Sequence, residues 1–165
     1  MPVKRDIRMC RQQGFSFVEL VIAVSVAAIV LGFGIPALSN ASANANLRST
    51  TMDLIASING ARAEAVNLRA DITLESANGD GDWGGSGWKY DHPNEGDREF
   101  SARGEVTVTE VSDIGDVTFT ANGTMEIAGA SELQFQICDH RAGITGRQIT
   151  VNRFGRLTNE DFTCP

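Results

Sequence analysis

Histidine and cysteine, which often serve as catalytic residues or metal ligands, are scarce in this sequence. Its 165 residues include two histidines, His92 and His140, and three cysteines. Neither histidine has the spacing of a metal-ligand pair. Asp139-His140 beside scattered serines is not the signature of a catalytic triad, because triads are defined by geometry rather than by sequence neighbours. The sequence therefore predicts a protein that is not an enzyme and that needs no cofactor or metal.

Charge is missing from one long stretch. The nineteen residues from Leu20 to Leu38 contain no Asp, Glu, Lys or Arg, and an α-helix needs ~20 apolar residues to cross the hydrocarbon core of a membrane. The residues before this run are basic, and the positive-inside rule places such a flank in the cytoplasm. We therefore expect a single span with the C-terminal part on the periplasmic side. The basic residues are Lys4, Arg5, Arg8 and Arg11.

The apolar run also lacks the small-residue cleavage site that follows a secretory signal. It ends instead in Gly34-Ile35-Pro36. Just before it stands Glu19, the one charged residue between Gly14 and Leu38. An isolated carboxylate at membrane depth costs roughly 2.5 to 3.5 kcal/mol and normally faces a partner. We therefore expect a positively charged group to meet Glu19.

The residues around Glu19 resemble a known leader junction. Gly14-Phe15-Ser16-Phe17-Val18-Glu19, followed by the apolar run, is similar to the class III leader of type IV prepilins and type II secretion pseudopilins. The resemblance implies that a prepilin peptidase cuts after Gly14 and methylates Phe15. It also implies that Glu19 pairs with the N-terminal amine of a neighbouring subunit, which would set the axial register of packed helices. The alternative is a plain single-pass anchor.

Removal of residues 1–14 would change both the charge and the cysteine content. These residues carry a net charge of +3, so the remaining chain would carry −10 instead of −7. Such an acidic chain is a poor general binder of nucleic acid or anionic lipid. Cys138 and Cys164 would remain, and an even pair in an oxidising compartment predicts a disulfide worth roughly 3 kcal/mol. The alternative is two unpaired buried thiols.

Helical periodicity continues beyond the apolar run. One helix is predicted from about Phe15 to Arg69, with a bend near the membrane exit because Pro36 removes one backbone hydrogen bond. Residues 15–38 would span the membrane and bundle with other subunits, whereas residues 39–69 would lie on the globular domain. The predicted buried face of the second half has a 3.6-residue period and consists of Leu47, Thr51, Leu54, Ile55, Ile58, Ala61, Ala65 and Leu68.

The residues at the end of this helix point to one group within the prepilin family. Ala61-Arg62-Ala63-Glu64-Ala65 before the short strand Ile72-Thr73-Leu74 resembles the GspH/FimT/FimU group of minor pilins and pseudopilins. The Gly-rich segment Asn78 to Tyr90, with Trp83 and Trp88, resembles the tryptophan-containing hairpin of the same group. Arg62 and Glu64 could equally form a solvated helix face.

The same Gly-rich segment has an alternative interpretation as a calcium loop. Asn78, Asp80 and Asp82 place oxygen ligands at every second position, as an EF-hand begins. The pattern then fails, because Trp83 and Lys89 stand where an EF-hand has Gly and Glu. We therefore expect an exposed acidic turn.

Short alternating runs separated by turn residues predict antiparallel strands after residue 100. The Asn122-Gly123-Thr124 turn is the firmest, and Leu133 to Arg156 resembles the C-terminal block of the same group, whereas residues 91–124 carry no such resemblance. The fold class is therefore α+β, a type IV pilin-like ladle in which one long helix packs on an antiparallel β domain of residues 70–165. The predicted strands are Glu105–Val111, Val117–Thr120, Glu132–Cys138, Gln148–Val151 and Gly155–Thr158.

Arginines gather in the last predicted strands. Arg147, Arg153 and Arg156 could contact DNA phosphates, and some minor pilins of this group take up DNA in natural transformation through a basic GRxR tail. Here Thr158 replaces the second arginine of that tail, and Glu160 and Asp161 follow shortly after. The alternative is that the arginines, Arg141 included, pair with carboxylates of the acidic domain.

Together these features lead to the hypothesis of a non-catalytic minor pilin or pseudopilin of the bacterial inner membrane. Its expected partners are other pilins or pseudopilins, prepilin peptidase, the inner-membrane assembly platform and, before assembly, membrane lipid. The filament would be a type IV pilus or a type II secretion pseudopilus. The subunit would act in initiation of the filament or at its tip, and would thereby serve pilus biogenesis or protein transport. The alternative, which is less favoured, is a DNA-binding minor pilin.

Overall fold

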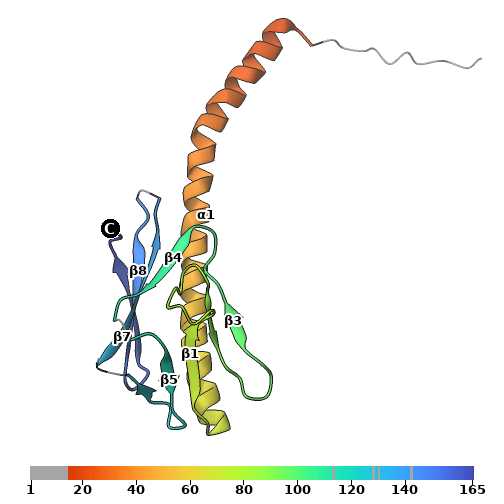
Figure 1. Ribbon diagram of the computed structural model, residues 1–165. Coiled ribbons are helices and arrows are strands. Elements are labelled where there is room, and N and C mark those ends of the chain that lie inside the picture. Colours follow the sequence, from red (N-terminus) through yellow and green to blue (C-terminus); the bar gives the residue numbers. More distant parts are fainter. Residues whose placement is uncertain (1–14, 113, 128, 130, 142) are drawn as a thin grey trace, which may run out of the picture. The chain divides into compact units, whose positions relative to one another are not determined.

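One long helix precedes a series of short strands. The computed structural model describes residues 15–112, 114–127, 129, 131–141 and 143–165. The helix α1 spans Phe17–Leu68 (Figure 1). The strands are β1 (Ile72–Ser76), β2 (Trp88–Tyr90), β3 (Arg98–Phe100), β4 (Val106–Glu110), β5 (Val117–Phe119), β6 (Met125–Glu126), β7 (Glu132–Asp139), β8 (Gly146–Asn152) and β9 (Leu157–Phe162).

Local backbone chemistry fixes both ends of α1. Ser16 stands at the N-cap position, a favoured site for serine, and its carbonyl accepts a hydrogen bond from the Leu20 N–H at 3.1 Å. At the other end Arg69 has a φ of 53°, and the Ala70 N–H donates to the Ala65 carbonyl at 3.2 Å. This is the Schellman arrangement that ends many helices. The predicted limits, Phe15 and Arg69, are therefore close to the observed ones.

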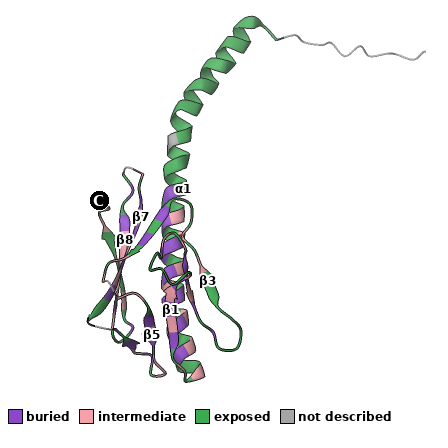
Figure 2. Cartoon of the chain, in the orientation of Figure 1, coloured by how far each residue is buried: buried purple, intermediate pink, exposed green. Residues whose placement is uncertain are grey.

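The chain divides into two units between Leu38 and Ser39. Among the described residues, the first unit contains the apolar part of α1 and the second contains the rest of α1 with all of the strands. The second unit is stabilised by a core of its own, whereas the first has no buried residue in its apolar window (Figure 2).

The strands of the second unit form two antiparallel sheets. One has the order β3-β2-β1-β5-β6 and the other the order β4-β7-β8-β9. Successive side chains of a strand point to opposite faces, and in β7 buried residues alternate with half-buried ones along Leu133–Asp139. The antiparallel α+β fold class is thus confirmed; its division into two sheets was not predicted.

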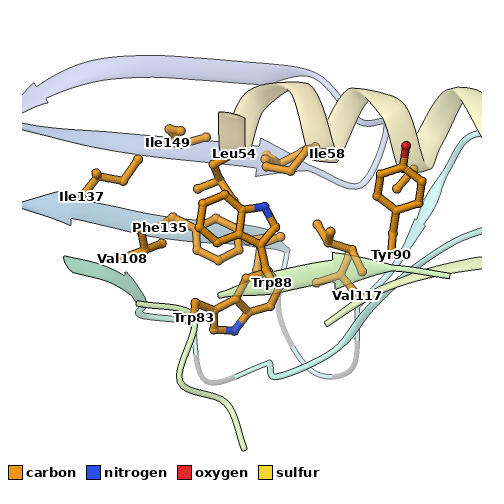
Figure 3. Packing of buried hydrophobic residues seen from close by; sticks show 14 of the residues in the cluster. Leu54, Ile58, Trp83, Trp88, Tyr90, Val108, Val117, Phe135, Ile137 and Ile149 are labelled. Carbon is orange, nitrogen blue, oxygen red and sulfur yellow. The ribbon is translucent and has the colours of Figure 1, made fainter. Parts of the chain in front are cut away.

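The second half of α1 packs against both sheets. Figure 3 shows Leu54 and Ile58 of the helix beside Phe135 and Ile149 of the second sheet and Trp88 of the first. Burial of such side chains contributes about 1.5 to 3 kcal/mol each. The predicted helix face is buried at Leu47, Thr51, Leu54, Ile58, Ala61 and Ala65, while Ile55 and Leu68 are half-buried at its margin.

The two tryptophans lie at the centre of this core. Trp88 stacks at 6.1 Å on the ring of Phe100, and its indole N–H donates to the Ser57 hydroxyl on α1 at 2.8 Å. Trp83 meets Phe135 edge to face, with ring centroids 4.8 Å apart. Because a buried indole N–H is costly without an acceptor, Ser57 makes it possible for Trp88 to lie against the helix.

The observed strand limits differ most from the predicted ones where a strand is short or where its predicted start lies in a turn. β3 and β6 were not predicted; they have three and two residues, too few to display a periodic pattern. Gly155 was predicted to begin the last strand but lies in a turn with a φ of +71°, and β9 begins at Leu157 and runs to Phe162. The alternation rule did not extend the strand to residues 159–162 because most of β9 is exposed.

Candidate assembly helix and the turns around Arg62

The apolar part of α1 is exposed along its whole described length. In this part of the chain, residues 17–35 are all exposed, and α1 is long and apolar enough to cross a membrane (Figure 2). A helix in the core of a soluble domain would bury such side chains, whereas this one buries none of its apolar window. Large exposed apolar surfaces of this kind mark membrane or protein contacts.

The predicted processing and assembly residues lie at the start of this segment, except that Gly14 lies outside the described residues. Phe15 is exposed, and Glu19 stands in the first turn of α1. A carboxylate there interacts favourably with the positive end of the helix dipole. Among the residues that the structure describes, Glu19 has no ion-pair partner within the chain. Any cation that meets it therefore comes from outside these residues.

Pro36 lies inside α1, and the helix continues past it to Leu68. Proline within a helix removes one backbone hydrogen bond. The bend that we expect at this position stays a prediction.

The disulfide predicted between Cys138 and Cys164 is present. It ties the end of β7 to the C-terminal segment over a separation of 26 residues, with the two Cα atoms 5.9 Å apart. Gly146 lies against both sulfurs, because a Cβ at this glycine would overlap Cys164 Sγ and would stand 3.1 Å from Cys138 Sγ. A glycine at the start of β8 therefore leaves the space that the disulfide occupies.

The three arginines considered for DNA binding do not form one cluster. Arg147 stands near the start of β8 and forms an ion pair with Asp161 of β9, its cross-strand neighbour. Arg153 and Arg156 lie in the turn at the other end of that strand. At 3.2–3.4 Å per residue, the six residues from Arg147 to Arg153 correspond to about 20 Å.

Arg141 has carboxylate partners as well. Its guanidinium makes two hydrogen bonds, of 2.8 and 2.7 Å, to the buried Asp139 carboxylate, and it lies 3.9 Å from Glu105. The hydrogen bonds from Arg141 hold the pKa of the Asp139 carboxyl below its usual value. Arg141 also donates to the carbonyl and hydroxyl of Ser39 at 3.4 Å, so the loop after β7 is tied to α1.

Arg62 has a structural role that the sequence reasoning did not find. Its Nε donates to the Gly123 carbonyl at 2.9 Å, and one Nη donates to the Gly155 carbonyl at 3.4 Å. These carbonyls belong to two different hairpin turns, between β5 and β6 and between β8 and β9. One helix side chain thus holds two turns that are 32 residues apart in the sequence. The sequence shows an arginine on the helix and a glycine in each turn, but these residue types alone do not identify the contact, because the acceptors are backbone carbonyls.

The two turns have the same construction. In each, a hydrogen-bonded pair of residues, Thr120 with Thr124 or Asn152 with Arg156, encloses three residues. The last of the three is a glycine, with φ of +73° at Gly123 and +71° at Gly155. This is the common three-residue hairpin loop with a glycine in the left-handed region. A Cβ at either glycine would also approach the Arg62 side chain, at 3.3 Å from Nε for Gly123 and 2.7 Å for Gly155. Glycine is therefore required both by the backbone and by the close contact.

Glu64, two residues further along α1, faces a different partner. Its carboxylate lies 3.6 Å from Nε2 of the buried His92. The other ring nitrogen, Nδ1, accepts hydrogen bonds from the backbone N–H groups of Asn94 and Glu95 at 3.3 and 3.0 Å. The proton of the neutral ring is therefore on Nε2, pointing toward Glu64. Arg62 and Glu64 thus contact loops of the domain and do not form a merely solvated face.

The acidic turn after β1 is closed by its own hydrogen bonds. Asp80 accepts from the Asp82 N–H at 2.9 Å and from the Ser86 hydroxyl at 3.2 Å, and Asp82 accepts from the Gly85 N–H at 2.8 Å. The bond from the Asp82 N–H is the main reason that the pKa of Asp80 lies below its usual value. No group of three potential metal ligands occurs among the described residues.

A long helix with an exposed apolar half, an acid in its first turn and an antiparallel β domain on its second half define a pilin-like subunit. Two families match the sequence: the one described as Type II transport protein GspH over residues 50–155, and the one described as Prokaryotic N-terminal methylation motif over residues 9–35. The chain therefore belongs to the GspH family of minor pilins and pseudopilins.

Solved structures agree with this assignment. The type IV minor pilin FimU of Pseudomonas aeruginosa, strain PAO1, is 31% identical to this chain in two crystal forms. One form gives a TM-score of 0.57 and covers 69% of this chain and 87% of FimU; the other gives 0.55, 69% and 92%. No curated protein sequence matches this chain. Because the family and these neighbours are structural subunits, the chain is a non-catalytic subunit as well.

Proposed function

We propose that this chain is a minor subunit of a type IV pilus or a type II secretion pseudopilus. A prepilin peptidase would cleave it after Gly14 and methylate Phe15. Before assembly the chain would sit in the inner membrane with its N-terminus in the cytoplasm, held by residues 15–38. Residues 39–69 and the β domain of residues 70–165 would lie in the periplasm, and the inner-membrane platform would then insert the subunit into the filament, at or near its tip.

The observation that carries this proposal is the exposed apolar helix with an unpaired acid at its start. The described apolar window of the first unit buries no residue within the chain, so we infer that its stabilisation comes from lipid or from the helices of other subunits. Glu19 has no ion-pair partner among the described residues. The amine of a neighbouring processed chain is a suitable partner, since an unpaired carboxylate at membrane depth costs roughly 2.5 to 3.5 kcal/mol.

DNA uptake is the alternative that the arrangement of arginines supports least. Arg141 and Arg147 already form ion pairs with carboxylates of the domain. Arg147 and Arg153 are separated by the length of β8, so they would contact phosphates as separate groups. A domain that carries an excess of acid would also repel the DNA backbone over most of its surface.

The first test is the intact mass of the membrane-extracted protein from cells with and without prepilin peptidase. We expect a chain that begins at methylated Phe15 only where the peptidase is present. A chain that keeps residues 1–14 in both strains would reject the proposal in favour of a plain anchored domain.

The second test is the exchange of Glu19. Glu19→Ala should leave processing and membrane insertion intact and strongly reduce recovery of the subunit in sheared filaments, because the cation of the neighbour loses its partner. Glu19→Asp keeps the charge and is the matched variant, with a smaller loss expected. Normal incorporation of Glu19→Ala would remove the assigned role of this residue.

A further inference from the structure

The turn between β8 and β9 displays an aromatic side chain to solvent. Phe154 is 73% exposed, the highest value among the large hydrophobic residues described after Ser39. Turn positions usually carry Gly, Asn, Asp, Ser or Pro, and an exposed phenyl ring forgoes the stabilisation that burial would give. Packing within the folded domain therefore does not account for Phe at this position.

The backbone of this turn is held in place by six hydrogen bonds. The N–H groups of Phe154 and Arg156 both donate to the Asn152 side chain at 3.0 Å. Asn152 N–H donates to the Arg156 carbonyl and Gly155 N–H to the Asn152 carbonyl, at 3.1 and 2.8 Å. The Arg153 carbonyl accepts from Met125 at 2.8 Å, and the Gly155 carbonyl accepts from Arg62.

A second exposed apolar side chain lies beside the Arg62 contacts. Val66 is 47% exposed and stands one helical turn after Arg62, and its Cγ2 is 2.9 Å from the position of a Cβ on Gly123. Arg62 itself touches the glycines of both turns. We call Val66, Phe154 and the exposed Arg156 the turn patch. Its residues belong to the C-terminal part of α1 and to the β8–β9 turn, which Arg62 links through its hydrogen bond to Gly155.

We propose that the turn patch is a docking site for the periplasmic domain of a neighbouring filament subunit, an inference that rests on the proposed function. Phe154 would fill an apolar depression on that neighbour, and Arg156 would pair with carboxylates at its rim. Aromatic residues and arginine are the usual hot spots of protein interfaces. A turn that is already fixed loses little conformational entropy on binding, and a guanidinium can bind a carboxylate through two hydrogen bonds.

A protein partner fits this site better than nucleic acid. Binding of single-stranded nucleic acid uses successive aromatic platforms along a basic groove, whereas this turn has one aromatic residue. Acidic side chains stand nearby, because exposed Glu126 follows Met125, which bonds to the turn, and exposed Glu132 is the cross-strand neighbour of Asn152. These carboxylates would repel phosphates.

A photo-crosslinking residue in place of Phe154 tests the proposal in the full-length chain within cells. We expect a crosslink to one protein that mass spectrometry identifies as another subunit with an apolar N-terminal helix. The matched position is Val111, which is 41% exposed just after the end of β4 and lies outside the turn patch. Equal crosslinking at both positions, a crosslink to DNA, or no crosslink at position 154 would overturn the proposal.

Phe154→Ala gives a quantitative readout with the same full-length protein. Loss of a hot-spot side chain costs at least about 2 kcal/mol, so association with the crosslinked partner in detergent extracts should weaken roughly thirtyfold. Val111→Ala should change it less than about twofold. Thermal unfolding of Phe154→Ala should match the wild type because the side chain is exposed, and unchanged association in such a folded variant would overturn the proposal.

These readouts separate the two proposals. If wild-type chain keeps residues 1–14 and stays out of filaments, the proposed function fails by that result alone. If wild-type and Phe154→Ala chains are processed and enter filaments equally well, with equal association, only the role of the turn patch fails.

Discussion

The two halves of α1 have opposite surroundings although they belong to one helix. Leu31 in the first half is 59% exposed, whereas Leu54 in the second half is completely buried beneath the two sheets. Both halves contain abundant apolar residues. They differ in pattern, because the first half is apolar on all sides, whereas the second is apolar on one face only.

This difference shows where each half obtains its stability. The second half is held by side chains of its own chain, such as Trp88 and Phe135, and folds as part of the domain. No described part of the chain covers the apolar window of the first half. Its stabilisation therefore depends on contacts with other molecules. Substitutions in the two halves should therefore have separate consequences, for the stability of the domain in one case and for membrane insertion and assembly in the other.

The largest expected effect is that of Leu54→Ala. Truncation of a fully buried leucine removes its transfer free energy and leaves a cavity, so the domain should lose about 2 to 5 kcal/mol of stability. Leu31→Ala is the matched variant and should leave the free energy of unfolding within about 0.5 kcal/mol of the wild type. Urea unfolding of the full chain in detergent, followed by tryptophan fluorescence, measures both. Similar losses in the two variants would contradict the separation of the halves.

A smaller effect is expected from the loss of the Arg62 contacts. Arg62→Met keeps an unbranched side chain but removes the donors to the Gly123 and Gly155 carbonyls, which should cost about 1 to 3 kcal/mol. Hydrogen exchange should speed up in both turns together. Arg48→Met is the control on the same helix, because Arg48 is exposed and the described residues give it no hydrogen bond or ion pair. Faster exchange in one turn alone would mean that Arg62 does not couple the turns.

The smallest effect is expected from Asp139, which makes the free energy of unfolding depend on pH. Its partner Arg141 also donates hydrogen bonds to Ser39 of α1. The pKa of the Asp139 carboxyl is lowered in the folded state from 3.8, chiefly by hydrogen bonds from Arg141. Its stabilisation is therefore complete above the unfolded value and is lost as the pH falls through the folded one. Unfolding curves at about pH 6 and below about pH 3 should differ less for Asp139→Asn than for the wild type. An equal or larger acid effect in Asp139→Asn would contradict this contribution.

Much of the fold could be predicted because its signals are local. The 3.6-residue period after Ala37 identified the helix face that the sheets cover, and Asn122-Gly123-Thr124 identified a turn with a left-handed glycine. Cys138 and Cys164 were predicted as a pair because the chain offers no other partner after residue 14. The short strands β3 and β6 and the full extent of β9 were missed, since exposure and short length weaken the alternation signal.

The contacts of Arg62 and Glu64 could not be predicted in the same way, whereas carboxylate pairing of Arg141 was one of the alternatives considered. The partners of Arg62 are carbonyl groups, which every residue has, so no side-chain pattern marks Gly123 and Gly155 as acceptors. Proximity of the two turns arises only when both sheets pack on α1. The DNA-binding interpretation combined Arg147 with Arg153 because they are close in sequence, but an extended strand separates residues that a helix would keep together.

By itself, the sequence determined the apolar helix, the acid at its start, the buried helix face and the cysteine pair, because each depends on residue type and spacing along the chain. Only the tertiary structure decided that Arg62 holds two hairpins, that Glu64 faces His92 and that Phe154 stands exposed on a fixed turn. Those arrangements depend on how strands from distant parts of the sequence pack on one helix, and long-range packing leaves no periodic trace in the sequence.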